Sequence, residues 1–343
     1  MNDRMNATNP SDFLLRVSDL HTSFFTPAGE VKAVGGVSFN VKRGEVLGIV
    51  GESGSGKSVT MLSVLGLLGT SGRVVGGSID FDGQELTRMR LRDLEELRGK
   101  RISMIFQDPM TSLNPVLTVR WQMEESLRRH RIPCDRHDRA VDMLKRVGIV
   151  PAERRLTQYP FQFSGGQRQR IMIAMAMICN PDLLIADEPT TALDVTVQAQ
   201  ILELMKELQG QFGTSIILIT HDLGVIAGMA DRVLVMYGGR IMERGTRREI
   251  FYEPAHPYTR GLLRSVPNPE ELVRQRLIPI EGQPPYLLNP PAGCPYAPRC
   301  PEAMRVCLEY PPDRTELTES HNAACWLLNR PAGSAADRKE GAR

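Results

Sequence analysis

A glycine-rich segment constrains the fold of this chain more than any other feature. Residues 51–58 read Gly-Glu-Ser-Gly-Ser-Gly-Lys-Ser, directly after the predicted strand 45–50 and at the start of a segment with helical spacing, about 57–68. Glycines allow a loop to curl until its backbone N–H groups converge on phosphate oxygens, and a helix start adds partial positive charge. This strand–loop–helix context matches the P-loop pattern G-x-x-x-x-G-K-S, which predicts binding of a nucleoside triphosphate.

The polar groups of this loop have predicted roles. Lys57 is expected to bridge the β- and γ-phosphates, and the hydroxyl of Ser58 to bind Mg²⁺. A chance glycine-rich turn is the alternative, and the strand and helix on either side of the loop argue against it. The residues predicted to contact the nucleotide are Gly51, Ser53, Gly54, Ser55, Gly56, Lys57, Ser58 and Val59.

An apolar run that ends in two acidic residues is the predicted second half of the site. Residues 183–188 read Leu-Leu-Ile-Ala-Asp-Glu, and a buried strand there would bring Asp187 to the edge of an α/β sheet where ligands bind. Asp187 is predicted to hold Mg²⁺ through a water molecule, and Glu188 is the candidate general base for the attacking water. A solvated acidic pair at a strand end is the alternative, which the P-loop in the same chain disfavours.

The order of apolar and helical segments predicts the fold class. They alternate along the first 265 residues, which favours an α/β fold with a mainly parallel sheet covered on both faces. We interpret residues 13–265 as a nucleotide-binding domain, with a helical subdomain inserted at about 109–178. Dense prolines at 266–330 predict a small irregular module whose core is separate from that of the P-loop. Residues 331–343 are predicted to be a disordered tail.

Charge and hydropathy argue against several other classes of protein. A net charge of only +2 over 343 residues leaves no electrostatic footprint for nucleic acid. No apolar run is long enough to span a bilayer, and the first ten residues lack the apolar core of a signal peptide. We therefore expect a cytosolic protein that meets a membrane only through a partner and does not bind nucleic acid.

Four of the six cysteines lie in the proline-rich module, namely Cys294, Cys300, Cys307 and Cys325. Disulfides are rare in a reducing cytosol, so such a cluster favours a metal. Cys294 and Cys300 are each followed by proline, as cluster-binding cysteines often are, whereas the close C-x-x-C pair of common zinc modules is not present among these four. The residues themselves leave an iron–sulfur cluster, zinc and unligated thiols open.

Four further features resemble the ATP-binding cassette (ABC) family and follow that family's order. Residues 163–167, Phe-Ser-Gly-Gly-Gln, resemble the ABC signature. Gln107 resembles the Q-loop glutamine, residues 192–194 the D-loop, and His221 the switch histidine. The resemblance implies that Gln107 and His221 are catalytic together with Glu188, and that Gln107 also binds Mg²⁺. The further nucleotide contacts that it implies are Ser164, Gly165, Gly166, Gln167 and Asp194.

The same resemblance implies a residue that stacks on adenine and a site that is shared between two subunits. Phe24 or Phe25 matches the family's adenine-stacking aromatic, and position favours Phe24. The signature precedes a predicted helix, so it is a second phosphate-binding helix start, away from the P-loop in the expected fold. One chain therefore carries two half-sites that cannot close on the same nucleotide. Two subunits that meet head-to-tail would bind ATP between the P-loop of one and the signature of the other.

Three motifs resemble one branch of this family, the ATP-binding subunits of oligopeptide, dipeptide and nickel importers. They are residues 106–115 (Phe-Gln-Asp-Pro-Met-Thr-Ser-Leu-Asn-Pro), residues 256–263 (His-Pro-Tyr-Thr-Arg-Gly-Leu-Leu) and residues 294–301 (Cys-Pro-Tyr-Ala-Pro-Arg-Cys-Pro). With them the resemblance spans nearly the whole chain. It implies an ATP-hydrolysing subunit that powers uptake of di- or oligopeptides. The alternatives are the same role in a nickel or other small-solute importer, and a soluble ABC ATPase without a permease.

The resemblance also implies partners and a cofactor. The complex would contain two membrane permeases, a second and usually different ATPase subunit, and an extracytoplasmic binding protein, with this chain on the cytoplasmic face of the inner membrane. Members that resemble this chain carry a [4Fe–4S] cluster, which the resemblance assigns to the four C-terminal cysteines. Met110, Leu113 and Leu117 are candidate contacts with a permease helix, and packing inside the helical insertion is the alternative.

Overall fold

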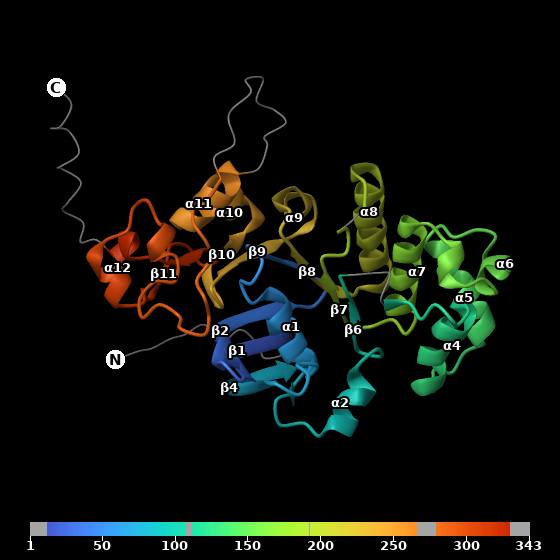
Figure 1. The fold of residues 1–343 in the computed structure, drawn as a ribbon. Coiled ribbons are helices and arrows are strands. Elements are labelled where there is room, and N and C mark those ends of the chain that lie inside the picture. Colours follow the sequence, from blue (N-terminus) through green and yellow to red (C-terminus); the bar gives the residue numbers. More distant parts are fainter. Residues whose placement is uncertain (1–11, 108–111, 192, 266–278, 330–343) are drawn as a thin grey trace, which may run out of the picture.

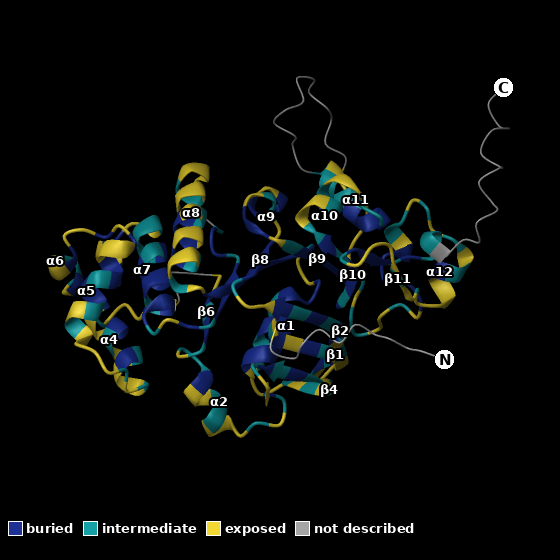
Figure 2. Ribbon diagram, turned by 180° about the vertical axis from the view of Figure 1, so that it is seen from behind, coloured by how far each residue is buried: buried dark blue, intermediate teal, exposed yellow. Residues whose placement is uncertain are grey.

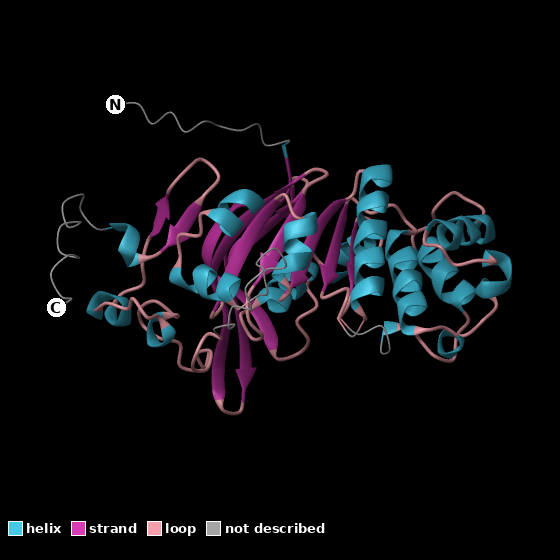
Figure 3. Ribbon diagram, turned by 90° about the horizontal axis from the view of Figure 1, so that it is seen from above, coloured by secondary structure: helices cyan, strands magenta, loops and turns pink. Residues whose placement is uncertain are grey.

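The computed structural model describes residues 12–107, 112–191, 193–265 and 279–329 (Figure 1). Within these residues the chain forms a large mixed sheet, a smaller antiparallel sheet and several helices. Figure 3, seen from above, shows the strands in the middle of the molecule and a group of helices at one end. This is the predicted α/β architecture with a helical insertion.

The large sheet joins strands from distant parts of the chain. Strands β9 to β6 pair in parallel, whereas β10 is antiparallel to both of its neighbours and β11 is antiparallel to β12. The prediction of a mainly parallel sheet is therefore confirmed. In spatial order the strands are β11 (Arg314–Glu316), β12 (Asn322–Ala324), β10 (Arg240–Thr246), β9 (Arg232–Tyr237), β3 (Val46–Val50), β8 (Ser215–Thr220), β7 (Leu183–Asp187) and β6 (Ile102–Ile105).

Successive residues of the central strands face two different hydrophobic cores. Leu47 and Ile49 of β3 pack with α1 (Lys57–Leu65) and the smaller sheet. Val46 and Val50 belong to the other core, which includes α8 (Val195–Phe212) and α9 (Leu223–Met229). Because both faces are covered, every residue of β3, β7 and β8 is buried, as Figure 2 shows for β8.

The smaller sheet is more extensive than the sequence pattern indicates. The apolar patterns at 37–41 and 79–81 by themselves indicate only short strands, and two glycines precede the first; the structure extends both strands by pairing them with β1 (Phe13–Thr26). α1 is shorter than predicted, because Gly66 takes a left-handed φ of 62° and ends it. In spatial order the strands of this sheet are β2 (Gly29–Lys42), β1 (Phe13–Thr26), β4 (Gly72–Phe81) and β5 (Gln84–Glu85). The helix α2 (Leu91–Leu97) follows β5 in the chain.

The helical insertion lies between β6 and β7 in the chain and beyond β6 in space (Figure 1). Leu113 is only 2% exposed and belongs to the hydrophobic core that the insertion shares with β3 and α8, while Leu117 is half-buried. Met110 and the expected start of the insertion at about 109 fall outside the described residues. None of the helices in the described ranges is both long and apolar enough to span a bilayer. The inserted helices are α4 (Val119–Arg129), α5 (Arg136–Arg146), α6 (Ala152–Leu156), η2 (Pro160–Gln162) and α7 (Gly165–Met177).

The C-terminal segment is built onto the nucleotide-binding domain, whereas the sequence suggested a separate core. β12 pairs with β10, so the β11–β12 hairpin covers what would be an open edge of the large sheet. Buried residues of this segment such as Tyr296 and Cys307 belong to the same hydrophobic core as Val46 and Val50 of β3. The expected tail 331–343 is outside the described residues. The helical elements here are α10 (Arg247–Tyr252), α11 (Pro257–Arg264), η3 (Ala297–Arg299), α12 (Arg305–Glu309) and η4 (Trp326–Asn329).

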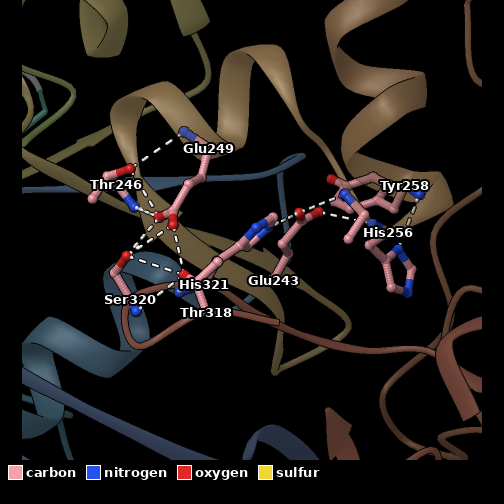
Figure 4. Close-up of polar contacts among 9 residues, drawn as sticks. Glu243, Thr246, Glu249, His256, Tyr258, Thr318, Ser320 and His321 are labelled. Atoms are coloured by element: carbon pink, nitrogen blue, oxygen red, sulfur yellow. Dashed lines mark hydrogen bonds and ion pairs between the residues drawn. The ribbon is translucent and has the colours of Figure 1, made fainter. Parts of the chain in front are cut away.

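A buried carboxylate ties the hairpin to the sheet (Figure 4). Glu243 of β10 is fully buried, and it accepts hydrogen bonds from the backbone N–H groups of Ala255 at 2.7 Å and His256 at 2.9 Å. Nε2 of His321 donates to the same carboxylate at 2.7 Å. A buried charge is tolerated only when such donors surround it, so the position of the hairpin depends on this contact.

A second carboxylate makes a neighbouring link (Figure 4). Glu249 of α10 accepts hydrogen bonds from the N–H of Thr246 at 2.7 Å and from the hydroxyls of Thr318 at 2.7 Å and Ser320 at 2.8 Å. Burial would raise the pKa of Glu249, but these hydrogen bonds outweigh it and lower the pKa to about 2. The link therefore stabilises the fold above the ordinary value of 4.5 and is lost only as the pH falls toward 2.

We predict that His321→Phe destabilises the chain, because Glu243 then stays buried with backbone donors alone. The loss of one donor to a buried carboxylate should lower the free energy of unfolding by about 1–3 kcal/mol, measured by urea denaturation. Arg305→Ala is the control, since it removes an exposed ion pair with Glu309 at 3.0 Å and should change stability by less than about 1 kcal/mol. Equal effects of the two substitutions would contradict the role of Glu243.

Candidate functional site

The glycine-rich loop leaves β3 at Val50 and enters α1 at Lys57. Gly51 has a φ of 152°, and a Cβ there would lie 2.1 Å from the carbonyl oxygen of Met236 in β9. Gly56 has a φ of 96°, and its Cβ would lie 2.7 Å from the carbonyl oxygen of Ala33 in β2. Only glycine fits at these two positions, because backbone from other strands lies directly against the loop.

Lys57 lies inside this loop with its side chain buried. Its ammonium group donates to the carbonyl oxygens of Gly51 at 2.7 Å and Glu52 at 3.0 Å. Burial lowers the pKa of Lys57, and the carboxylates of Glu188, Asp187 and Glu52 oppose this shift. The charge is thus held at the mouth of the loop, where a P-loop lysine meets phosphate oxygens.

The two halves of the site meet at Ser58 and Asp187. The Ser58 hydroxyl, in the first turn of α1, donates to Oδ1 of Asp187 at the end of β7, at 3.1 Å. Burial raises the pKa of Asp187, and the hydrogen bond from Ser58 opposes this shift. A hydroxyl and a carboxylate are oxygen ligands of the kind that Mg²⁺ takes in nucleotide sites, where phosphates provide others. The residues present therefore fit Mg²⁺ bound with a nucleotide.

Three side chains from separate segments converge on Glu188. Its carboxylate accepts hydrogen bonds from Nε2 of Gln107 and the hydroxyl of Thr191, both at 2.9 Å, and lies 3.2 Å from Nδ1 of His221. Glu188 has a φ of 48°, which is unusual for a residue with a side chain. Its N–H donates to the carbonyl of Ile219 at 2.8 Å, so the neighbouring strand β8 stabilises this turn.

The electrostatics of Glu188 keep its carboxylate in the unprotonated form, which a proton acceptor must have. Burial would raise its pKa, but the hydrogen bonds from His221 and Thr191 outweigh it and lower the pKa. The structure brings together Gln107, Glu188 and His221, and places Gln107 on Glu188 rather than on the Ser58–Asp187 pair. Sequence reasoning missed Thr191. The signal in the sequence was its position three residues after Glu188, which is the spacing of a turn. In the structure the N–H of Thr191 donates to the carbonyl oxygen of Glu188 at 3.2 Å.

The signature residues lie in a different part of the molecule. Ser164 caps α7, where its Oγ accepts from the N–H of Gln167 at 3.3 Å and the Gln167 side chain accepts from Ser164 N–H at 3.1 Å. A Cβ on Gly166 would lie 2.8 Å from Val197 of α8, and Asp194 caps that helix by accepting from Val197 N–H at 2.9 Å. α7 packs on β6, and two strands separate β6 from β3, a distance of about 14 Å at ordinary strand spacing. The signature therefore does not join the P-loop cluster of its own chain.

Both candidate adenine-stacking residues are near the end of β1. Phe24 is half-buried, and a Cβ on Gly72 of β4 would lie 2.8 Å from its ring. Phe25 is 48% exposed, with the guanidinium of Arg73 at 5.9 Å from its ring centroid. The two rings keep accessible surface, so both are able to stack on a base.

The four C-terminal cysteines surround one small cavity but do not form a metal site. The volume of this cavity is only about 10 Å³, roughly enough for one water molecule. Burial raises the pKa of Cys294 and Cys325 to about 11, so these thiols stay protonated and pack as apolar groups. In the part of the chain that the structure describes, no group of three or more His, Cys, Asp or Glu side chains is arranged to hold a metal ion. The predicted iron–sulfur cluster is therefore wrong. The lining includes Cys294, Cys300, Cys307, Cys325, His256 and Trp326.

Two family models match separate parts of the chain. The model described as "ABC transporter" matches residues 34–191, and that described as "Oligopeptide/dipeptide transporter, C-terminal region" matches residues 242–307. The chain is 55% identical to the dipeptide transport ATP-binding protein DppD of Bacillus subtilis, over 93% of this chain and 96% of that protein. It is 54% identical to the oligopeptide transport ATP-binding protein OppD of Salmonella typhimurium, over 89% and 91% of the two chains.

Solved structures agree with this likeness. The ATP-binding cassette MJ0796, in a dimeric post-hydrolysis structure bound to ADP and Pi, has a TM-score of 0.61 and 30% identity, over 68% of this chain and 99% of that chain. The protein cbiO1 from Clostridium perfringens, part of the ABC transporter complex cbiONQ, has a TM-score of 0.60 and 32% identity, over 71% and 92%. This chain therefore belongs to the ATP-binding proteins of ABC transporters, in the branch that carries the oligopeptide/dipeptide transporter C-terminal region.

Proposed function

We propose that this chain is the ATP-hydrolysing subunit of an importer of di- or oligopeptides. One observation carries the proposal, namely that a single chain joins the P-loop site to the C-terminal region matched by the oligopeptide/dipeptide model. Relatives that match over nearly their whole length are named as dipeptide and oligopeptide transport ATP-binding proteins. The site and the C-terminal region thus support the same role.

The side chains at the sheet edge divide the work of ATP hydrolysis. Lys57 would neutralise the terminal phosphates, and Ser58 with Asp187 would hold Mg²⁺, which would supply further positive charge to the phosphates. Glu188 accepts the proton of the attacking water, because its carboxylate stays ionised and is fixed by three side chains. Gln107 and His221 hold the carboxylate of Glu188 in place.

A second ATPase subunit completes each site. α7 begins at the signature and packs on β6, which is about 14 Å from the P-loop strand β3, so we assign the start of α7 to a nucleotide on another subunit. Head-to-tail pairing would close ATP between two chains, and hydrolysis would release them. The partner is a different ATPase chain, which makes the pair a heterodimer.

The remaining partners follow from transport. The chain would sit on the cytoplasmic face of the inner membrane, held by two permease subunits that provide the path for the solute. An extracytoplasmic binding protein would deliver the peptide to them. Closing and opening of the ATPase pair then switches the permeases between two states, since ATP favours one of them.

Solute uptake tests this proposal. Proteoliposomes should contain the chain with its permeases and second ATPase, with ATP inside and the binding protein outside. We expect ATP-dependent uptake of a labelled dipeptide or a longer peptide, abolished by Lys57→Ala, with no uptake of labelled Ni²⁺. Uptake of Ni²⁺ alone would contradict the peptide substrate. ATP hydrolysis with no uptake of either solute would support an ATPase that acts without a permease.

We predict that Glu188→Gln lowers the hydrolysis rate by about 10²–10⁴, because the amide cannot accept the proton of water. Nucleotide affinity should stay close to that of the wild type, since Lys57 and the loop are unchanged. The measurements are phosphate release by the assembled complex and calorimetric binding of a slowly hydrolysed ATP analogue. Glu203→Gln on the exposed face of α8 is the matched control. Normal turnover in Glu188→Gln would rule out the general-base role.

A second pair of substitutions distinguishes the two adenine-stacking candidates. Stacking of a base on an aromatic ring contributes about 1–3 kcal/mol, so Phe24→Ala should weaken ATP binding by roughly 5–150-fold. Phe25→Ala should bind normally, because we assign the stacking contact to Phe24. Equilibrium binding of a fluorescent ATP analogue measures both. The reverse result would move the contact to Phe25.

A further inference from the structure

Glu52 is the P-loop residue to which the sequence analysis gave no role, and three of its groups are engaged. Its N–H donates to the hydroxyl of Tyr258 at 2.9 Å. Its carbonyl oxygen accepts from the ammonium of Lys57 at 3.0 Å. Its carboxylate accepts two hydrogen bonds from Arg299, at 2.5 and 3.0 Å. Two of these three partners lie in the C-terminal region that follows β10.

Arg299 is held in one orientation. Its side chain is only 5% exposed. Besides its two bonds to Glu52, it donates to the hydroxyl of Tyr237 at 3.1 Å and to the carbonyl oxygens of Ile280 at 3.0 Å and Glu281 at 2.8 Å. These five hydrogen bonds match the five N–H groups of a guanidinium. A lysine could not reproduce the two-pronged contact with a carboxylate.

Aromatic rings pack around this ion pair. Tyr237 at the end of β9 contacts Tyr258 of α11 with ring centroids 4.6 Å apart, and Tyr296 of the C-terminal segment lies 5.2–5.3 Å from both. Gly238 follows β9, and a Cβ there would lie 2.9 Å from the side chain of Pro295. The C-terminal region is therefore packed directly against the end of β9 that faces the P-loop, and it reaches the loop through Glu52.

We propose that Arg299 is a positioning residue of the nucleotide site, which holds the first turn of the P-loop through Glu52 and so makes nucleotide affinity depend on the C-terminal region. The inference rests on the proposed ATP site. The backbone of Glu52 is fixed on one side by Tyr258 and Arg299, and on the other it carries the carbonyl that contacts Lys57. If the contacts with Tyr258 and Arg299 are lost, the phosphates of the nucleotide must order the loop when they bind. The nucleotide then binds more weakly, because part of its binding free energy is used to order the loop.

Two consequences separate this role from a purely structural one. Glu188 and its three partners follow β6, β7 and β8 and do not contact Glu52 in the hydrogen bonds described above, so loosening Glu52 should raise the KM for ATP and leave kcat unchanged at saturating ATP. Coupling between two sites is reciprocal. Nucleotide should therefore protect the C-terminal region from proteolysis, and this protection should depend on the Glu52–Arg299 contact.

The test uses the full chain and calorimetric binding of ATPγS. Glu52→Gln keeps the size of a partly exposed side chain, and Arg299→Lys keeps the charge. Each should weaken binding about 5–30-fold, the effect of ordering roughly one residue's backbone. The double variant should be no weaker than the weaker single one, because both remove the same contact. Arg260→Lys is the matched control, since Arg260 pairs with Glu302 at 2.9 Å in the same region, and it should bind as the wild type does.

Wild-type affinity in Glu52→Gln and Arg299→Lys, or additive losses in the double variant, would overturn the inference. So would a fall in kcat without a rise in KM in the assembled complex, or ATPγS that fails to protect residues 279–329 of the wild-type chain. Lys57→Ala distinguishes a failure of the proposed ATP site from a failure of the Arg299 role alone. Unchanged ATPγS affinity in that variant would overturn the proposed ATP site itself, and this inference with it.

Discussion

The site depends on the parallel pairing of β6, β7, β8 and β3. Because neighbouring parallel strands end at the same edge of a sheet, the residues that follow them enter one region of space. Gln107 follows β6, Glu188 follows β7, His221 follows β8, and the P-loop follows β3. A slip of one residue in any pair would move a side chain by about 3.3 Å and to the opposite face. The hydrogen bonds to Glu188 would then be lost, so the buried strands determine the catalytic geometry.

The charged groups at this edge have opposed preferences. Burial lowers the pKa of Lys57 and raises that of Asp187, so each charge is disfavoured by its surroundings and supported by the other. Glu188 is different, because hydrogen bonds from His221 and Thr191 keep it charged. A magnesium–nucleotide complex brings negative phosphates and a positive metal ion to this edge. Lys57 is the partner for the phosphates and Asp187 is the partner for the metal ion. The arrangement is thus ready for phosphate chemistry before any ligand is bound.

The C-terminal region also contacts this edge of the sheet, which its composition does not indicate. Its prolines and weak periodicity suggested a module with its own core, stabilised by a metal on four cysteines. Instead, burial keeps thiols such as Cys294 protonated, and no metal-binding group is found in the described ranges. The region is attached by the β11–β12 hairpin, by Glu243, and by the ring cluster around Tyr258. The Glu52–Arg299 ion pair extends this attachment into the P-loop.

Sequence patterns were sufficient to predict the features that depend on local backbone geometry. Glycines at 51 and 56 indicate positive φ angles and close backbone contacts, so the P-loop could be predicted. Uninterrupted apolar runs indicate strands that are covered on both faces, so the parallel sheet could be predicted as well. The convergence of Gln107 and His221 on Glu188 was inferred only from resemblance. Tertiary structure alone decided the contact between Glu52 and Arg299, which are 247 residues apart, and the arrangement of the cysteines. No local pattern records such contacts, because they arise from how separately formed elements pack together.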